Sequence, residues 1–201
     1  MKKILVLFAH PKFERSKVNR ALVEKIRKRE GVTFHDLYER YPDFNIDVFI
    51  EKKLLSEHDV IIWHHPLYWY SCPPLLKHWI DLVLEFNWAY GPSGDALKGK
   101  QALNVITAGG TRAVYCSEGN NNYSINEFLR PFEQTARLCK MDYFPPFGVM
   151  GANGISDDGI ATAVAQYDQL ISVLQEGLVP SIAGRCDYLN DIPQLQTAQS
   201  L

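Results

Sequence analysis

Short apolar runs recur along this chain, and segments with helical spacing separate them. The first run, residues 4–9, is apolar without interruption, which is typical of a strand covered on both faces in a parallel sheet. The other expected strands lie at residues 32–37, 59–63, 102–107 and 143–150. Five strands that alternate with five helices predict a doubly wound α/β sheet. The favoured strand order is 2-1-3-4-5, and half of a Rossmann fold is the alternative that the pattern leaves open.

Prolines refine two of these elements. Ser124 and Glu127 form a capping box at the start of a helical pattern, and Pro131 should kink that helix or split it in two. Pro145 and Pro146 stand near the start of the last expected strand. Because proline cannot donate to a sheet ladder, we expect this strand at an edge.

Length and charge narrow the class of protein. The 201 residues suggest one domain, residues 1–180, followed by an irregular tail, residues 181–201, that trails over the surface. A net charge of -2 gives no reason to expect nucleic acid as a partner. The chain start has no features of a signal peptide, and the four cysteines form no ligand motif, so we expect a cytoplasmic protein with reduced thiols and no metal.

Three loops should meet at one edge of the sheet, because ligands of such folds bind beyond the carboxyl ends of the strands. The first loop, residues 10–16, precedes a helix whose N-terminus attracts anions, and His10, Ser16 and Asn19 add side-chain donors. It contains neither a dinucleotide fingerprint nor a Walker lysine motif. One terminal phosphate would fit here, and a plain helix cap is the alternative.

The other two loops offer flat and bare surfaces. Tyr68, Trp69 and Tyr70 crowd the turn after the third strand, which favours a flat ligand, a fold back onto the core or a subunit interface. Gly109 and Gly110 follow the fourth strand and let a ligand approach the backbone, unless they only form a tight turn. A flat ring with one phosphate matches all three loops, and FMN is such a molecule.

Longer motifs add a resemblance to a known family. The segments that carry it are FAHP at 8–11, SKVN at 16–19, DLY at 36–38, YPDFNID at 41–47, HPLYWYSCPPLLK at 65–77, WAYG at 88–91 and LRPFE at 129–133. In these the chain resembles the flavodoxin-like NAD(P)H:quinone oxidoreductases. It looks closest to the ancillary flavoproteins of the glutathione-gated bacterial potassium efflux systems, known as the Kef type. The likeness extends over about residues 3 to 176.

The resemblance implies a role for each loop. Residues that would surround the FMN phosphate are His10, Ser16, Lys17, Val18 and Asn19. Residues that would form a wall beside the isoalloxazine, with backbone N–H groups near N5, are Pro66, Leu67, Tyr68, Trp69 and Tyr70. Residues that would approach the ring at N1 and O2 are Thr107, Ala108, Gly109 and Gly110. FAD is the less favoured cofactor.

The resemblance also implies a homodimer in which the partner completes the site. Phe86, Trp88 and Tyr90 would then cover the neighbour's flavin, and their alternative is ordinary core packing. Tyr115 stands where relatives have a catalytic tyrosine, but residues 119–122 read GNNN where relatives often have a histidine. Tyr115 is therefore the one catalytic candidate, with a purely structural role in the pocket as its alternative.

The expected activity is an FMN-dependent transfer of a hydride from NAD(P)H and then of two electrons to a quinone or similar acceptor. The alternative is a regulatory subunit of a potassium/proton antiporter, held at the inner membrane through that partner, with secondary redox activity. A one-electron flavodoxin carrier is a weaker third interpretation. The remaining histidines suggest no metal: His64 and His65 end a strand, and His35 and His58 are expected at the surface.

Overall fold

A parallel sheet forms the centre of the protein, whose computed structural model describes residues 1–179 and 186–196. Its strands are β1 (Ile4–Phe8), β2 (Val32–Asp36), β3 (Val60–Pro66), β4 (Gln101–Ala108), β5 (Asp142–Tyr143) and β6 (Phe147–Met150). They are ordered β2-β1-β3-β4-β5, with β6 also paired to β4, and every pairing is parallel. The expected flavodoxin-like order 2-1-3-4-5 is confirmed.

The strand predicted at residues 143–150 differs from the prediction. One strand over residues 143–150 was expected, but the structure has β5 and β6 as separate short strands. Pro145 and Pro146 lie between them and have no N–H group for the ladder, so β4 pairs with each piece in turn. The edge position itself is confirmed.

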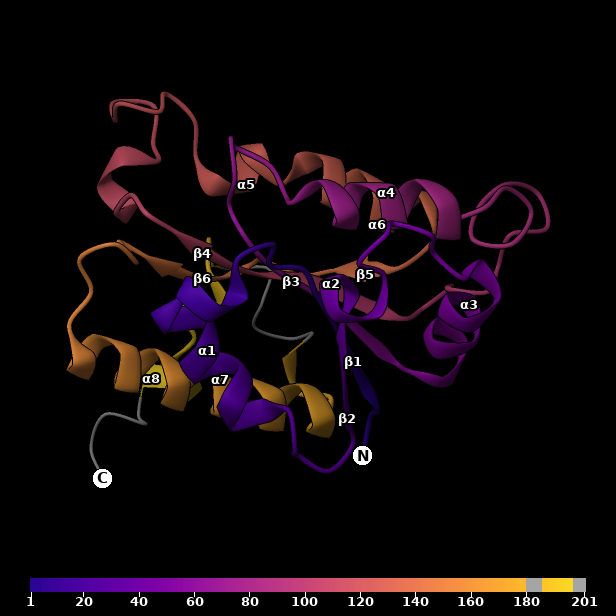
Figure 1. Ribbon diagram of the computed structural model, residues 1–201, viewed down its shortest axis with the longest axis horizontal. Helices are drawn as coiled ribbons and strands as arrows, with labels where there is room; N and C mark the ends of the chain where they lie inside the picture. The colour runs from indigo at the N-terminus through magenta and orange to yellow at the C-terminus, as the bar shows by residue number, and fades with distance from the viewer. Residues whose placement is uncertain (180–185, 197–201) are drawn as a thin grey trace.

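Helices cover both faces of the sheet (Figure 1). They are α1 (Lys17–Ile26), α2 (Leu37–Arg40), α3 (Val48–Glu57), α4 (Pro74–Val83), α5 (Ile125–Phe128), α6 (Arg130–Leu138), α7 (Asp157–Glu176) and α8 (Pro193–Gln196). The expected split at Pro131 separates α5 from α6, and the capping box of Ser124 and Glu127 opens α5. The four-residue α2 was expected as part of a loop.

Two buried clusters explain why the strand sequences are apolar without interruption. On one face, Leu7 and Trp63 pack with Trp79 of α4 and Phe132 of α6. On the other face, Val6 and its neighbours pack with α1 and α7. Figure 1 shows α4, α5 and α6 above the sheet and α1 and α7 below it. Side chains that alternate along one strand therefore enter different clusters, and both are apolar.

A buried carboxylate connects the elements on one side of the sheet. Glu51 of α3 is fully buried and binds His35 Nε2 at 2.8 Å, the Tyr41 hydroxyl at 2.6 Å and Trp79 Nε1 at 2.7 Å. His35 is thus half-buried and bonded, and His58, expected at the surface, is buried against Thr33. The surface expectation for His58 is wrong, because both of its ring nitrogens have protein partners.

The C-terminal segment, which we define as residues 186–196, is more ordered than predicted. It contains a 3-10 turn, Leu189–Asp191, and the short helix α8. Leu189, Ile192 and Leu195 are buried in the second cluster, so the expectation of a surface tail is wrong for these residues. Residues 180–185 and 197–201 of the expected tail lie outside the described residues. Among the helices of the described residues, none has the length and apolar character needed to cross a bilayer.

Candidate functional site

The three predicted loops meet around one cavity of about 410 Å³ at the carboxyl ends of β1, β3 and β4. Its walls come from His10, Lys12, Arg15, Ser16, Lys17, Val18, Pro66, Leu67, Tyr68, Thr107, Ala108, Gly109, Ala152 and Asn153. Ten of these residues were predicted from the sequence. The volume is within the range of roughly 300–1,000 Å³ that is typical of small-molecule sites.

The start of α1 makes one end of this cavity suitable for an anion. Ser16 is the N-cap, and its Oγ accepts from the backbone N–H of Asn19 at 3.3 Å. The N–H groups of Lys17 and Val18 have no acceptor within the helix, because they are its first two residues. These groups and the helix dipole face the cavity end where an anion would be stabilised.

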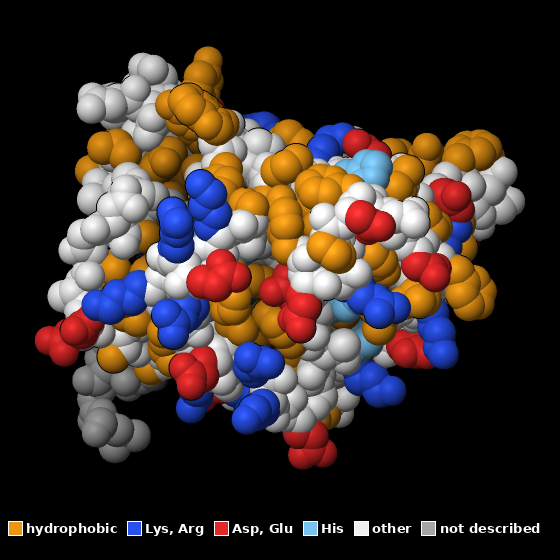
Figure 2. All heavy atoms as spheres, viewed as in Figure 1, with side chains coloured by type: hydrophobic (Ala, Val, Ile, Leu, Met, Phe, Trp, Pro, Cys, Tyr) orange, Lys and Arg blue, Asp and Glu red, His pale blue; other side chains and the backbone are white. Residues whose placement is uncertain are grey.

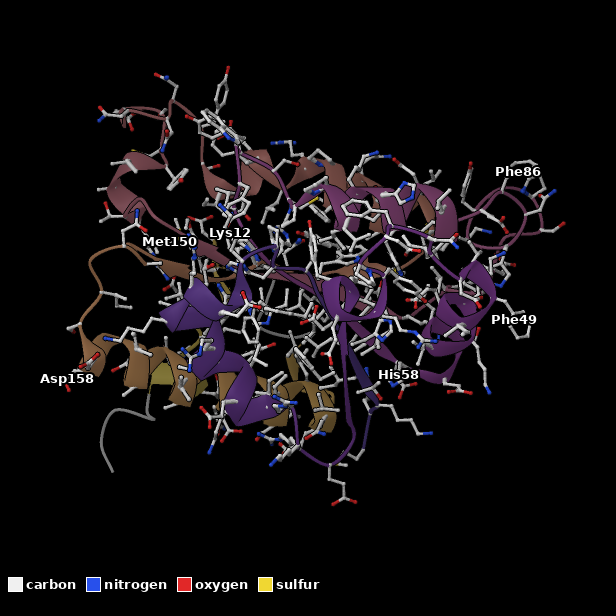
Figure 3. All side chains as sticks on the ribbon, in the orientation of Figure 1. Lys12, Phe49, His58, Phe86, Met150 and Asp158 are labelled. Atoms are coloured by element: carbon white, nitrogen blue, oxygen red, sulfur yellow. The ribbon has the colours of Figure 1, made fainter. Side chains whose placement is uncertain are left out.

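Two cationic residues that were not predicted, Lys12 and Arg15, line the same end. Neither forms an ion pair with any residue in 1–179 or 186–196. Figure 2 shows Lys and Arg side chains gathered around the start of α1, and Figure 3 places Lys12 there. The sequence could have indicated them, because both positive charges lie within residues 10–16, the loop predicted to bind an anion.

His10 contributes a neutral donor to this end. Its Nδ1 accepts from the backbone N–H of Lys12 at 3.1 Å, which leaves Nε2–H as the free donor. Burial lowers the pKa of His10, so the ring is neutral at pH 7. The ring also lies edge-on to Tyr68, with centroids 6.0 Å apart, and thereby connects the anion end to the aromatic turn.

Asn19 lies beneath the cavity instead of in its wall. It is 1% exposed, and its Nδ2 donates to Ser16 Oγ and to Thr107 Oγ1, each at 2.9 Å. Its Oδ1 accepts from His64 Nε2 at 3.0 Å. Burial lowers the pKa of His64 to about 3, so this histidine is a neutral donor. Asn19 thus fixes two wall residues, Ser16 and Thr107, from below, and no pattern in the sequence indicated His64 as its partner.

The aromatic turn has an unusual backbone. Tyr68 and Ser71 exchange two backbone hydrogen bonds of 3.0 Å, and the residues between them, Trp69 and Tyr70, have φ values of 47° and 63°. A two-residue turn of this kind favours Asn-Gly, because a left-handed conformation costs other residues roughly 1–2 kcal/mol each. The Trp69 side chain is 92% exposed, so its burial does not offset this cost. Such strain is retained mainly at functional sites.

The third loop presents bare backbone to the cavity. A Cβ on Gly109 would lie 2.6 Å from Asn153 Nδ2, and one on Gly110 would lie 2.8 Å from Val114 Cγ2 and 3.0 Å from the Tyr115 ring. Asn153 lies in the loop after the last strand, which was not expected at the site. The backbone N–H of the neighbouring Ala152 donates to the Ala108 carbonyl at 2.9 Å. Gly109 lines the cavity, and Gly110 lies behind it against Tyr115.

Tyr115 lies beside the cavity, within an aromatic cluster. Phe128 contacts Tyr115 edge-on at 6.2 Å and stacks on Tyr70 at 4.9 Å. Burial raises the pKa of Tyr115, so its hydroxyl keeps its proton at neutral pH. The Tyr70 hydroxyl donates to Asn121 Oδ1 at 3.3 Å. These contacts connect the aromatic turn after β3 with the loop after β4.

Five predicted site residues therefore fall outside the cavity wall: Asn19, Trp69, Tyr70, Gly110 and Tyr115. Phe86, expected to cover a flavin, is 60% exposed and lies at the far end of the molecule from Lys12 (Figure 3). Two larger hollows, of 950 and 620 Å³, do not combine the three loops. Among the described residues, no group of three His, Cys, Asp or Glu side chains could hold a metal ion.

Fold and site together define an α/β protein with a phosphate-compatible helix start and an aromatic turn at the switch point of its sheet. The chain belongs to the family described as having a flavodoxin-like fold, whose sequence pattern matches residues 2–171.

Two curated relatives match nearly their whole length. General stress protein 14 of Bacillus subtilis is 45% identical over 170 residues, which are 83% of this chain and 97% of the relative. The glutathione-regulated potassium-efflux system ancillary protein KefG of Pectobacterium atrosepticum is 44% identical over 170 residues, 85% of this chain and 93% of the relative.

Two solved structures extend the comparison. General stress protein 14 of Treponema denticola, solved in complex with FMN, has a TM-score of 0.79 and 37% identity, with 88% of this chain and 99% of that chain covered. A protein of P. pentosaceus described as an NADPH-quinone reductase has a TM-score of 0.76 and 32% identity, with 85% of this chain and 97% of that chain covered.

Proposed function

We propose that this protein is an FMN-dependent oxidoreductase that takes electrons from NAD(P)H and passes them to a quinone or similar acceptor. The observation that carries the proposal is the cavity in which the start of α1, the bare backbone at Gly109 and the aromatic turn converge. The FMN complex and the quinone reductase among the similar structures support it. When bound, FMN supplies the redox chemistry by accepting a hydride and returning two electrons.

The donor set at the start of α1 fits one phosphate. The N–H groups of Lys17 and Val18, the Ser16 hydroxyl and the neutral His10 would donate hydrogen bonds, while Lys12 and Arg15 would balance the charge. This arrangement offers more positive charge than a helix start alone. It therefore favours a phosphate ester over a neutral ligand.

The middle of the cavity fits a flat ring. Gly109 has no side chain to keep a ring edge from the backbone, and Tyr68 with Pro66 and Leu67 forms the facing wall. Asn19 holds Thr107 and Ser16 in position from below, so ring and phosphate ends are fixed relative to one another. A rigid site of this kind orients a ring and excludes water from one of its faces.

The open side would receive both substrates in turn. Trp69 and Tyr70, which directly follow the wall residue Tyr68 and which we call the rim, are exposed flat side chains on which a nicotinamide or a quinone can stack. Tyr115, which keeps its proton, can donate a hydrogen bond on this side. One shared face requires the oxidised nicotinamide to leave before the acceptor binds.

A homodimer would complete the open side. Phe86 is too far from the cavity of its own chain to act there, and it is exposed. Exposed apolar side chains include Leu82 on α4 and Phe44, Trp69 and Tyr123 in loops. Figure 2 shows hydrophobic side chains along the upper edge of the molecule. A second copy could cover these side chains and bring its Phe86 to the site.

A second candidate is the regulatory role in potassium efflux. The 44% identity with KefG, an ancillary protein of a potassium-efflux system, favours it. The two functions are compatible, because a subunit of an antiporter can also be a flavoprotein. Potassium efflux measured in a deletion strain tests this role, and efflux equal to that of the parent strain would count against it.

The main test is reconstitution of the purified protein with FMN. We expect flavin absorbance to remain after desalting, to bleach with NADH or NADPH and to return with a quinone. Arg15→Gln should weaken FMN binding about tenfold, because a hydrogen bond to a charged group contributes roughly 1.5–3 kcal/mol. Arg20→Gln, an equal charge change on the exposed side of α1, is the control. A protein that retains no FMN would refute the proposal.

A further inference from the structure

The C-terminal segment, residues 186–196, lies outside the part of the chain that defines the family. The family match ends at residue 171, and the relative from Bacillus subtilis is covered to 97% by 170 of the 201 residues. The segment is nevertheless anchored, since Leu189, Ile192 and Leu195 are buried. Two hydrogen bonds also join it to the edge of the sheet. The backbone N–H of Leu189 donates to the Pro146 carbonyl at 2.9 Å, and the side-chain Oδ1 of Asn190 accepts from Gly148 N–H at 2.8 Å.

This segment forms hydrogen bonds at both ends of the loop after β4. The loop, residues 111–124, extends from the end of β4 to the N-cap of α5 and stands out at the upper left of Figure 1. At its start, one guanidinium nitrogen of Arg112 donates to both carboxylate oxygens of Asp191, at 2.8 and 3.0 Å. Just beyond its end, Asn126 Nδ2 donates to the Asp187 carbonyl at 3.0 Å.

Tyr188 fixes Arg112 from a second direction. The guanidinium carbon of Arg112 lies 4.1 Å from the centroid of the Tyr188 ring, within the range of a cation–π contact. The ring itself lies against Gly148, where a Cβ would come within 3.0 Å of it. Arg112 is thus held by a carboxylate and an aromatic ring that belong to the same short segment.

Loop 111–124 carries Tyr115 and Asn121, which lie on the open side of the candidate site. Tyr115 lies three residues after Arg112 and packs on Gly110, directly behind the cavity wall. Asn121, near the other end of the loop, accepts from the Tyr70 hydroxyl in the strained turn. A shift of this loop would therefore move both Tyr115 and Tyr70 relative to the cavity.

We propose that the C-terminal segment is a strap that sets the position of loop 111–124. Asp191 is a positioning residue that acts through Arg112. By holding the loop in place, it determines how well the electron acceptor is used. No residue of the strap lines the cavity. It therefore acts on the open side and leaves cofactor affinity unchanged. The kinetic part of this inference rests on the proposed function.

The test compares Asp191→Asn with Asp187→Asn in the full-length protein loaded with FMN. Both variants lose one carboxylate of the C-terminal segment, but only Asp191 is paired with Arg112. We expect Asp191→Asn to lower kcat/KM for a quinone about threefold to tenfold, because small displacements of positioning groups cost that much or more. FMN affinity should stay within about twofold, Asp187→Asn should match the wild type, and Asp191→Glu should recover at least half of the loss.

A second readout does not depend on the flavin. In the protein without FMN, backbone amides of residues 111–124 should exchange hydrogen faster in Asp191→Asn than in the wild type, while amides of α1 should not change. If amides of the loop exchange at the same rate in Asp191→Asn and in the wild type, the strap proposal is wrong, whether or not the protein is an oxidoreductase. Faster exchange with unchanged kcat/KM would overturn the positioning role, and failure to bind FMN would instead refute the proposed function.

Discussion

His64 donates a hydrogen bond of 3.0 Å to Asn19 from inside the sheet, and this bond links β3 to the helix start that forms the anion end of the cavity. Both side chains are buried, and Asn19 uses its amide nitrogen for Ser16 and Thr107. Each polar atom of Asn19 therefore has a partner. The site is positioned by a polar connection between two sheet strands and α1.

Replacing Asn19 by alanine should destabilise the protein and weaken FMN binding together. The buried Nε2–H of His64 would lose its acceptor, and leaving such a group unsatisfied costs about 1–3 kcal/mol in addition to the lost bonds. We expect the free energy of unfolding, measured with urea, to fall by about 2–4 kcal/mol. Asn45→Ala, at an exposed position, should change it by less than about 0.5 kcal/mol. Equal effects of the two substitutions would contradict the role of Asn19.

Gly109→Ala should reduce FMN affinity without unfolding the protein. The new methyl group would meet Asn153 Nδ2 at 2.6 Å, and this end of a side chain can move away from it. The methyl would then occupy the strip where the ring edge is expected. We predict a loss of at least about tenfold in affinity by fluorescence titration, equivalent to roughly 1.4 kcal/mol. Gly154→Ala, where no atom lies within 4 Å of the added Cβ, is the control.

The buried carboxylate of Glu51 predicts how stability depends on pH. Burial alone would raise its pKa, but the bonds from His35, Tyr41 and Trp79 outweigh burial and lower the pKa below the ordinary value of 4.5. A lowered folded-state pKa stabilises the protein above pH 4.5, and this contribution is lost as the pH falls through the folded-state value. Glu51→Gln should therefore cost about 2–4 kcal/mol at pH 7, since three donors then face an uncharged amide.

The measurement is urea unfolding of wild type and Glu51→Gln at several pH values between neutral and acidic. The difference between the two unfolding free energies should shrink below pH 4.5, because only the wild type carries the titrating group. A difference that stays constant throughout this range would show that Glu51 does not lose a proton on acidification in the way its contacts require.

Much of the fold followed from the sequence, because apolar runs report burial on both faces of a strand. The joint position of the three loops followed as well, since parallel strands end at one edge of a sheet. Asn153 was missed because it belongs to the loop after β6, which was not expected at the site, although the end of that strand at residue 150 was predicted correctly. The burial of Leu189, Ile192 and Leu195 had a weak signal in their three-residue spacing, which Pro193 interrupts. Strain at Trp69 depends on backbone angles that no side-chain pattern reports.

Trp69→Gly should make the protein more stable and less active. The φ value of 47° at Trp69 suits glycine, and the 92% exposed indole loses little burial when it is removed. We expect a gain of about 1 kcal/mol in the free energy of unfolding from the relieved left-handed conformation. We also expect kcat/KM for the quinone to fall about tenfold, because the rim loses the flat side chain on which substrates stack. Urea unfolding and steady-state kinetics measure the two effects.

Lys140→Gly is the matched control, because Lys140 also has a positive φ, of 59°, but follows α6 and is not part of the aromatic turn. Its kinetic constants should stay within about twofold of the wild type, as expected for a surface change away from the site. The wild-type kinetics should also follow a ping-pong pattern, with parallel double-reciprocal lines, since both substrates use the rim at Trp69. A Trp69→Gly protein that is more stable and as active as the wild type would show that the strained turn serves the fold and not the substrates.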